Sequence, residues 1–297
     1  MELSIPIRKQ ATSFKLTHTK RFAQFHKRIQ QELLQHRVIT HNPFCQWFEE
    51  GNATPLQVKA FVVQFSVFSN LFLMAQLKKM INADSIEGMR ASKEILANEI
   101  GVVFHQAHKA KVKQKIRNKD KEGDPELVST EGTIEGGLFH FRAAHFEWLL
   151  RICEKLNLKF TEVGKRRHGT PATLFFCDEL SRLYGHEDYR ISSAASYAVE
   201  NWAAAGFWKQ LICGFEIFKK KHCPGLPLAF FTWHDRLEDQ HALHTQEELE
   251  EYFFEHPDLD QNLFIQSGNE MMEGVWTFWE GLDEQRKSLE KKSLKLG

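Results

Sequence analysis

Apolar residues recur every three to four positions along most of this chain, which is the spacing of one face of an α-helix. Runs of alternating apolar and polar residues are almost absent, and Gly and Pro are scarce. We therefore predict an all-α protein, a single domain over residues 1–297 with roughly seven or eight helices. The predicted helices cover residues 13–37, 54–81, 84–101, 139–157, 170–184 and 188–221, and two more begin near residues 228 and 258.

Several helix starts carry capping signals. Thr54-Pro55-Leu56-Gln57 places a Thr at the cap, a Pro at the first helical position and a Gln that can close a capping box. Thr170-Pro171 predicts a second start of the same kind. Thr245 with Glu248 is a further capping-box pattern, so the helix that begins near residue 228 is predicted to kink or restart there.

Residues 102–134 interrupt the helical pattern. Basic residues occupy every second position from Lys109 to Lys121, which neither a helix face nor a half-buried strand requires. We predict a solvated, mobile insertion, with a contact to anionic lipid or to a phosphorylated substrate left open. The charged residues 284–297 are predicted to form a frayed tail.

The charge balance narrows the function classes. Lys+Arg and Asp+Glu both number 39, and the absence of a basic excess argues against a general nucleic-acid binder. The longest apolar neighbourhood, residues 61–75, is interrupted by polar side chains, so we expect no transmembrane segment, and no secretory signal is recognisable. The five cysteines are widely spaced without a CxxC, which favours reduced thiols in a cytosolic protein. A homodimer is left open.

The most informative motif is a set of metal-ligand types on one predicted helix. His234, Glu238 and His241 stand at i, i+4 and i+7, and a turn of about 100° per residue puts them on one face. Two imidazoles and a carboxylate suit iron, manganese or zinc. His244 could be a further ligand, or it could hydrogen-bond to one of the ligands without touching the metal. The alternative is a polar helix face that is exposed to solvent.

A metal on one helix needs ligands from facing helices. Glu200 lies in a stretch rich in Ala and Ser, where an isolated acid usually has a charged partner or a metal. Glu99 stands at the end of an amphipathic helix, and His145 lies on a strongly amphipathic one with His140 and Glu147 as rivals. For Glu200 and Glu99 the alternative is an ordinary surface carboxylate.

The order Glu, His, Glu and H-x3-E-x2-H resembles the haem-oxygenase-like di-metal oxidases. That group includes the Chlamydia protein associating with death domains, a fatty-acid decarboxylase that makes terminal alkenes, and N-oxygenases of amino-acid derivatives. Its fold is shared with thiaminase II and PQQ-synthesis protein C, which lack the metal. The resemblance covers roughly residues 40–255, with Glu238 where Asp is commoner, and it implies a haem-oxygenase-like helical bundle.

The resemblance also implies a ligand set. One metal would take Glu99, His145 and His241, the second would take His234 and Glu238, and Glu200 would bridge or be shared. Having both Glu99 and His145 requires the insertion to loop out of a continuous helix, and otherwise Glu135 or His140 replaces one of them. His140 and His244 are the candidates for residues behind the ligands.

The implied activity is an O2-dependent oxidation by two ferrous ions per chain, with manganese as the other candidate metal. The substrate would be a small organic molecule, fatty-acid-like or an amine or amino-acid derivative. An apolar pocket could be lined by the helical stripe Phe61, Phe65, Phe68 and Phe72 together with Phe207, Trp208, Phe215 and Phe218. A plain core role is the favoured interpretation of that stripe.

The sequence leaves three other functions open. A thiaminase-II-like hydrolase without cofactor needs a nucleophilic cysteine, for which Cys177 and Cys213 are the candidates. A non-enzymatic binding protein could have the same fold. Haem binding would use Gly132-x3-Gly136, which has the spacing of a distal kink but lies beside the insertion.

Overall fold

The computed structural model describes the backbone of residues 7–106, 130–134, 137–141, 144–256 and 258–294. Side chains are described within these ranges except at 7–19, 87, 91, 94, 98, 103–106, 130–134, 137–141, 237–244 and 293–294. The helices are α1 (Ile7–Glu32), α2 (Arg37–Thr40), α3 (Pro43–Glu49), α4 (Pro55–Ile81), α5 (Ile86–Glu99), α6 (His145–Lys155), α7 (Pro171–Glu179), α8 (Tyr189–Ala203), α9 (Phe207–His222), α10 (Ala229–Glu255) and α11 (Gln261–Leu294). Shorter turns are η2 (Phe160–Glu162), η3 (Arg166–His168) and η4 (Leu180–Tyr184), and the strands are β1 (Val102–Gln106), β2 (Thr130–Ile134) and β3 (Gly137–Phe141).

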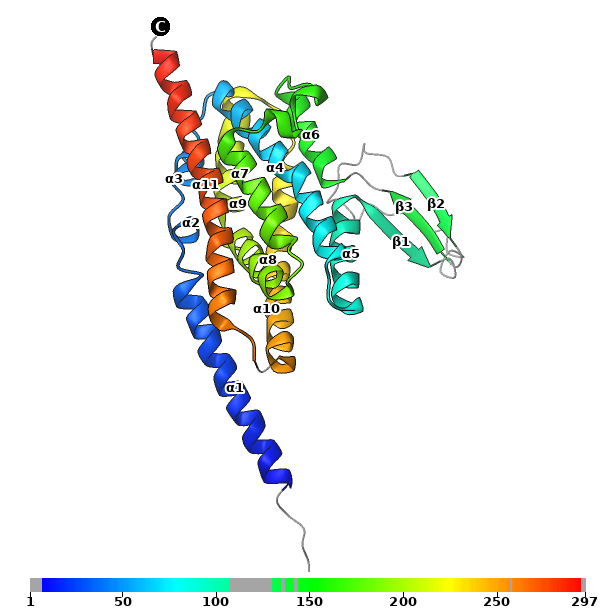
Figure 1. Cartoon of the computed structure of the whole chain (residues 1–297). Coiled ribbons are helices and arrows are strands. Elements are labelled where there is room, and N and C mark those ends of the chain that lie inside the picture. The colour runs from blue at the N-terminus through cyan, green and yellow to red at the C-terminus, as the bar shows by residue number, and fades with distance from the viewer. Residues whose placement is uncertain (1–6, 107–129, 135–136, 142–143, 257, 295–297) are drawn as a thin grey trace, which may run out of the picture.

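The long helices form a bundle, as the apolar periodicity predicts (Figure 1). α11 packs along α8 and α7, and α10 packs against α8 and α9. α4 contacts α5, α6, α7 and α11 and is therefore central to this group of helices. The all-α prediction is confirmed, with more helical segments than expected.

The predicted caps are found where the sequence places them. Thr54 Oγ1 accepts a hydrogen bond from Gln57 N at 3.3 Å, and Thr54 N donates to Gln57 Oε1 at 2.9 Å, which completes the capping box of α4. Thr170 caps α7 by accepting a hydrogen bond from Thr173 N at 3.3 Å, and Pro171 is at the first helical position. The predicted restart at Thr245 is wrong, because α10 continues through it and Thr245 is buried inside the bundle.

The single helix predicted over residues 188–221 is two helices. Gly206 separates α8 from α9 with a φ of 96°, a left-handed conformation that a residue with a Cβ adopts only with strain. The break lets α9 turn and lay its buried residues against α3 and α10.

The two described ends of the predicted insertion, residues 102–106 and 130–134, are strands and form a sheet with β3, which follows the insertion. β3 lies between β1 and β2 and pairs with both in antiparallel register (Figure 1). The missed signals were the β-branched and aromatic residues of β1 and β2 and the Gly137 that opens β3. The Lys-rich run, Lys109 to Lys121, lies entirely outside the described residues.

The predicted frayed tail is helical to Leu294 in α11. Contacts at its start hold it to the bundle. Asp283 pairs with Arg286, whose guanidinium lies 4.4 Å from the Trp47 ring centroid, and Gln57 Nε2 donates to the Arg286 carbonyl at 3.2 Å. These packed partners explain why a charged sequence remains ordered here.

The core is rich in phenylalanine, and α4 supplies much of it. Phe61, Phe65 and Phe68 are buried, and Phe61 packs against Phe48 and Phe215. Among the described helices, α4 is the one long and apolar enough to cross a membrane by length and composition. Half of its most apolar window, 50%, is buried in the bundle, and core helices of soluble proteins pass the same test.

His36 at the start of α2 predicts an acid sensitivity of the fold. Its Nδ1 accepts a hydrogen bond from Val38 N at 3.3 Å, and its Nε2 lies 3.2 Å from Glu273 Oε1. Burial lowers the pKa of His36 below 6.5, although Glu273 pulls it upward. Below this pH the unfolded chain therefore binds more protons than the folded protein, so the contribution present above pH 6.5 is lost on acidification.

We expect the free energy of unfolding in urea to fall between pH 7.5 and 5.5, and to fall less in His36→Gln. The pKa of Glu273 is lowered from 4.5, so its own contribution is lost only in a more acidic range. His222→Gln is the control, because His222 is exposed, and its unfolding should have the pH dependence of wild type. A His36→Gln protein with the same pH dependence as wild type would contradict this assignment.

Candidate metal site

Glu99 and His145 meet although the insertion separates them in sequence. Glu99 is the last residue of α5, and His145 is the first residue of α6. Between them, the antiparallel β1–β3 pair places Val102 opposite Phe141 and closes the insertion at its base. As a result Nδ1 of His145 lies 3.0 Å from Oε2 of Glu99.

This close contact is not an ordinary hydrogen bond. The His145 side chain is 6% exposed, and its Nδ1 has no hydrogen-bond partner among the described residues. The two atoms are thus adjacent without donor–acceptor alignment. Two ligand atoms that bind one metal ion at right angles to each other, with bonds of about 2.0–2.2 Å, are about 3 Å apart. The 3.0 Å between His145 Nδ1 and Glu99 Oε2 therefore fits two atoms that bind the same cation.

His234 comes from α10 and is fixed by its own helix. Its Nδ1 lies 2.6 Å from the Phe230 carbonyl oxygen, to which it donates, and this tautomer puts the ring lone pair on Nε2. The imidazole stacks on Trp208 at 4.8 Å and lies edge-on to His145 at 5.0 Å between ring centroids. A backbone acceptor on the far nitrogen is the usual support of a metal-binding histidine.

Glu200 is the fourth predicted ligand in this region. It is 8% exposed on α8, where Ala194, Ala195 and Ala198 are fully buried. Their small side chains let α10 and α11 approach α8 closely. Glu200 lines the same cavity as Glu99, His145 and His234.

The donor atoms that the structure brings together fit a divalent metal ion. One ligand atom each from Glu99, His145 and His234 lies within 4.8 Å of the others. Two imidazoles and carboxylates suit iron, manganese or zinc. The structure thus groups His234 with Glu99 and His145, whereas the resemblance assigns it to the other metal.

The cavity at these residues has a volume of about 70 Å³, with mostly aromatic walls. Such a volume holds only very small molecules, so an organic substrate requires the walls to move. Buried polar atoms without a hydrogen-bond partner among the described residues gather here, and each costs free energy unless a ligand satisfies it. Those on cavity-lining residues are Gln76 Oε1, His145 Nδ1, Trp202 Nε1 and Trp208 Nε1.

The predicted apolar pocket is only partly this cavity. Phe65, Phe68, Phe72 and Trp208 line it. Phe61 and Phe215 pack in the core, Phe207 stacks on Trp202 at 4.6 Å, and none of these three lines the cavity, nor does Phe218. The other lining residues were not predicted, and they are Ser69, Gln76, Ile95, Val199, Trp202, Ala203 and Phe230. Gln76 could have been found, because it continues the Phe65–Phe68–Phe72 stripe with a polar residue.

Several predicted positions lie outside what the structure describes. The side chains of Glu238, His241 and His244 on α10 and of His140 on β3 are not among the described ones, and neither is Glu135. The same holds for Gly136 of the haem-type spacing. The second half of the predicted ligand set therefore stays a prediction.

Comparisons with known proteins agree on the architecture. No protein-family model matches the chain, and no curated protein matches it in sequence. A TenA homolog from Pseudomonas syringae superposes with a TM-score of 0.60 at 11% identity, covering 88% of this chain and 92% of its own. A domain of unknown function from Shewanella denitrificans, described as having a heme oxygenase-like fold, gives 0.55 at 12% identity over 97% and 96%. This chain has the haem-oxygenase-like fold.

A CADD-like protein of unknown function from Nostoc punctiforme is also similar. It superposes with a TM-score of 0.57 at 16% identity and covers 91% of this chain and 99% of its own. At such identities the likeness shows the fold alone, so the chemistry has to be argued from the residues above.

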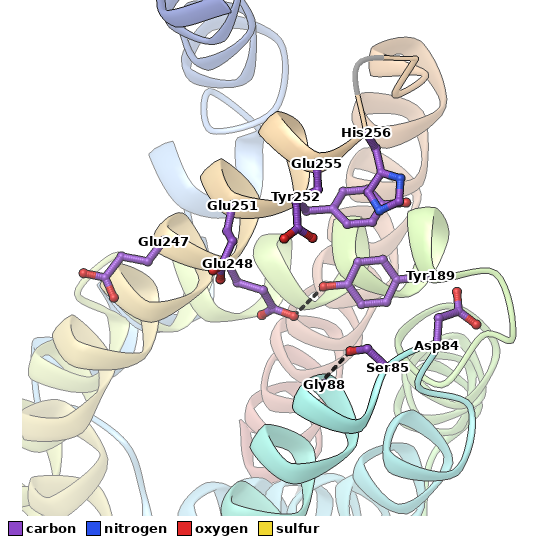
Figure 2. Close-up of a pocket in the computed structure, with 10 residues that line it drawn as sticks. All are labelled: Asp84, Ser85, Gly88, Tyr189, Glu247, Glu248, Glu251, Tyr252, Glu255 and His256. Atoms are coloured by element: carbon purple, nitrogen blue, oxygen red, sulfur yellow. Dashed lines mark hydrogen bonds between the residues drawn. The ribbon is translucent and has the colours of Figure 1, made fainter. Parts of the chain in front are cut away.

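A second pocket, of about 570 Å³, opens between α5, α8 and α10 (Figure 2). Tyr189 donates a hydrogen bond to Glu248 Oε1 at 2.7 Å across it. Its other carboxylates, on Asp84, Glu247, Glu251 and Glu255, are exposed to solvent. Since solvated acids of this kind are common without a ligand, the larger volume does not make it the functional site.

The cysteines of the hydrolase alternative do not lie at the cavity. Of the described residues that line it, none is a cysteine. Burial raises the pKa of the Cys177 thiol to about 12, whereas Cys213 is exposed. A nucleophilic thiol needs a lowered pKa and access to the substrate. Cys177 has a raised pKa and is buried, and Cys213 is accessible but does not line the cavity.

Thiol labelling with an aromatic disulfide at pH 8 tests this. We expect Cys213 to react in the folded protein and Cys177 to react only after unfolding, because the thiolate attacks and Cys177 is buried and protonated. Peptide mapping after labelling identifies the modified residues. If Cys177 in the folded protein is labelled as fast as Cys213, the prediction is wrong and Cys177 is again a candidate nucleophile.

Proposed function

We propose that this protein is a non-haem, metal-dependent oxidoreductase that uses O2 to oxidise a small organic substrate. The observation that carries the proposal is the convergence of Glu99, His145 and His234 on a buried cavity that Glu200 also lines. Iron is the metal we favour, with manganese as the alternative. Iron, when bound, supplies the redox chemistry that O2 activation needs.

The residues of this chain have distinct tasks around the metal. Glu99, His145 and His234 would hold it, and the carboxylates of Glu99 and Glu200 would offset its charge in a buried site. The Phe230 carbonyl and the Trp208 ring keep the His234 imidazole in one orientation. Phe65, Phe68 and Phe72 also line the cavity, where they would exclude water and so limit side reactions of reactive species.

A second ion is part of the proposal on the strength of the sequence motif. Glu238 and His241 share α10 with His234, at the spacing that puts them on one helix face. With Glu200 as the shared carboxylate, the chain would hold two ions, as in other helical carboxylate sites.

Metal reconstitution under nitrogen tests the function. The metal-free chain is incubated with ferrous ions, freed of excess and analysed for iron, and we expect about two ions per chain. Oxygen consumption is then followed with a series of fatty acids and amines. A chain that takes up neither iron nor manganese would contradict the oxidoreductase, whereas metal uptake without stimulated oxygen consumption would reject only the substrates tested.

A further inference from the structure

Gln76 is a buried amide that the protein satisfies at only one end. Its side chain is fully buried on α4 and lines the cavity beside Glu99, His145, Glu200 and His234. Nε2 donates a hydrogen bond to the Tyr184 hydroxyl at 2.7 Å. Oε1 has no hydrogen-bond partner among the described residues, although it is buried from solvent. A buried acceptor without a donor costs free energy.

Gln64, on the same helix, shows how such an amide is normally used. It is 4% exposed, its Nε2 donates to the His168 carbonyl at 3.0 Å, and its Oε1 accepts from Thr170 N at 2.7 Å. Both ends of that amide bind the backbone that leads into α7. Gln64 therefore has a structural role, and the contrast with Gln76 is within one element.

The Tyr184 hydroxyl that binds the Gln76 amide belongs to a buried polar network. Lys79 donates to Ser196 Oγ at 2.7 Å and lies 5.1 Å from the Tyr184 ring centroid, and Ser196 also hydrogen-bonds the Tyr184 hydroxyl. An ammonium can only donate, so the serine oxygen accepts from it. This buried network of Lys79, Ser196 and Tyr184 surrounds the hydroxyl to which Nε2 donates, and Oε1 is left without a partner among the described residues on a residue that lines the cavity.

We propose that Gln76 is a ligand-recognition residue, whose Oε1 accepts a hydrogen bond from an O–H or N–H group of a molecule in the cavity. Two sources supply that chemistry, a water molecule on the metal or an organic substrate. The inference rests on the proposed function in so far as the metal brings the ligand there. It favours amines and hydroxylated molecules over unsubstituted fatty acids, since a hydrocarbon chain offers Gln76 no donor.

The first test needs no metal and compares Gln76→Met with Gln64→Met in the full chain. Methionine keeps the length of the side chain and removes the amide. We expect Gln76→Met to melt within about 2 °C of wild type, because one hydrogen bond is lost and one unsatisfied acceptor removed. Gln64→Met should melt at least about 5 °C lower, because two backbone groups lose their partners. A Gln76→Met protein that melts as low as Gln64→Met would overturn the proposal.

The second test uses cobalt(II), whose visible absorption reports binding, and two carboxylates that differ by one hydroxyl group, glycolate and acetate. If bound water is the donor, Gln76→Met binds cobalt(II) about tenfold more weakly than wild type without any organic ligand. If the ligand is organic, cobalt(II) affinity is unchanged, and the preference for glycolate over acetate falls about fivefold or more. Unchanged values in both measurements would overturn the role of Gln76.

The two proposals fail separately. A wild-type chain that takes up no cobalt(II) would contradict the metal-dependent function. The melting comparison would still decide whether Gln76 has the structural role of Gln64, because that measurement is made on the metal-free protein.

Discussion

Replacing His145 by alanine is expected to lower the affinity for ferrous or cobalt(II) ions by at least about 100-fold. The residue supplies a nitrogen that lies 3.0 Å from the Glu99 carboxylate and has no hydrogen-bond partner among the described residues. Without it, the described side chains that remain to bind the metal are the His234 imidazole and the carboxylates of Glu99 and Glu200. These three residues are fewer than the four ligands of a typical structural metal site. Direct titration of cobalt(II) absorption measures the loss.

Thermal unfolding gives an independent measure of the same variant. A ligand at 100 times its dissociation constant stabilises the folded state by about 2.7 kcal/mol, so saturating metal should raise the melting temperature of wild type. At the same metal concentration a 100-fold weaker His145→Ala gains only about 0.4 kcal/mol, so its melting temperature should rise far less than that of wild type. His222→Ala is the matched control, because His222 is an exposed histidine at the end of α9. His145→Ala with the metal affinity of wild type would remove His145 from the site.

Local signals in the sequence were sufficient for most of the helices. The Thr54 capping box depends on residues three positions apart, and the structure contains both of its hydrogen bonds. Gly206 shows the limit of this reasoning. The apolar periodicity runs through residues 188–221, and only a positive φ at one glycine divides them into α8 and α9.

The neighbours of Glu99 could not be predicted from spacing. Its approach to His145 depends on pairing between Val102 and Phe141, a contact between two strands that helical periodicity does not reveal. The resemblance supplied both residues, but their proximity required the insertion to be closed by a sheet. His234 was predicted from its own helix, and the structure adds the Phe230 carbonyl that selects its tautomer.

Gln76 was overlooked for a different reason. Apolar periodicity finds core positions, and a polar residue within an aromatic stripe counts as an interruption. Its importance appears only when hydrogen-bond partners can be assigned, since Gln64 on the same helix is equally buried but satisfied at both ends. The number of partners, and not burial, separates the two glutamines.

Replacing Gly214 by alanine is expected to lower the free energy of unfolding by at least about 2 kcal/mol. Gly214 lies within α9 where this helix crosses α3. An added Cβ would lie 2.8 Å from the carbonyl carbon of Phe48 and closer still to its oxygen. That carbonyl accepts a hydrogen bond from Gly51 N at 3.0 Å, and Phe48 is 1% exposed, so the backbone has little freedom to retreat.

The same substitution should also weaken the metal site, because α9 carries the Trp208 that stacks on His234. Urea unfolding measures the stability change, and cobalt(II) titration measures the effect on the site. Gly88→Ala in α5 is the control, since its new Cβ would lie 3.1 Å from the Ser85 hydroxyl and would meet no backbone atom of another element. There the gain in helix propensity should keep stability within about 1 kcal/mol of wild type. If Gly214→Ala is as stable as Gly88→Ala, α3 and α9 are not in the close contact that positions Trp208.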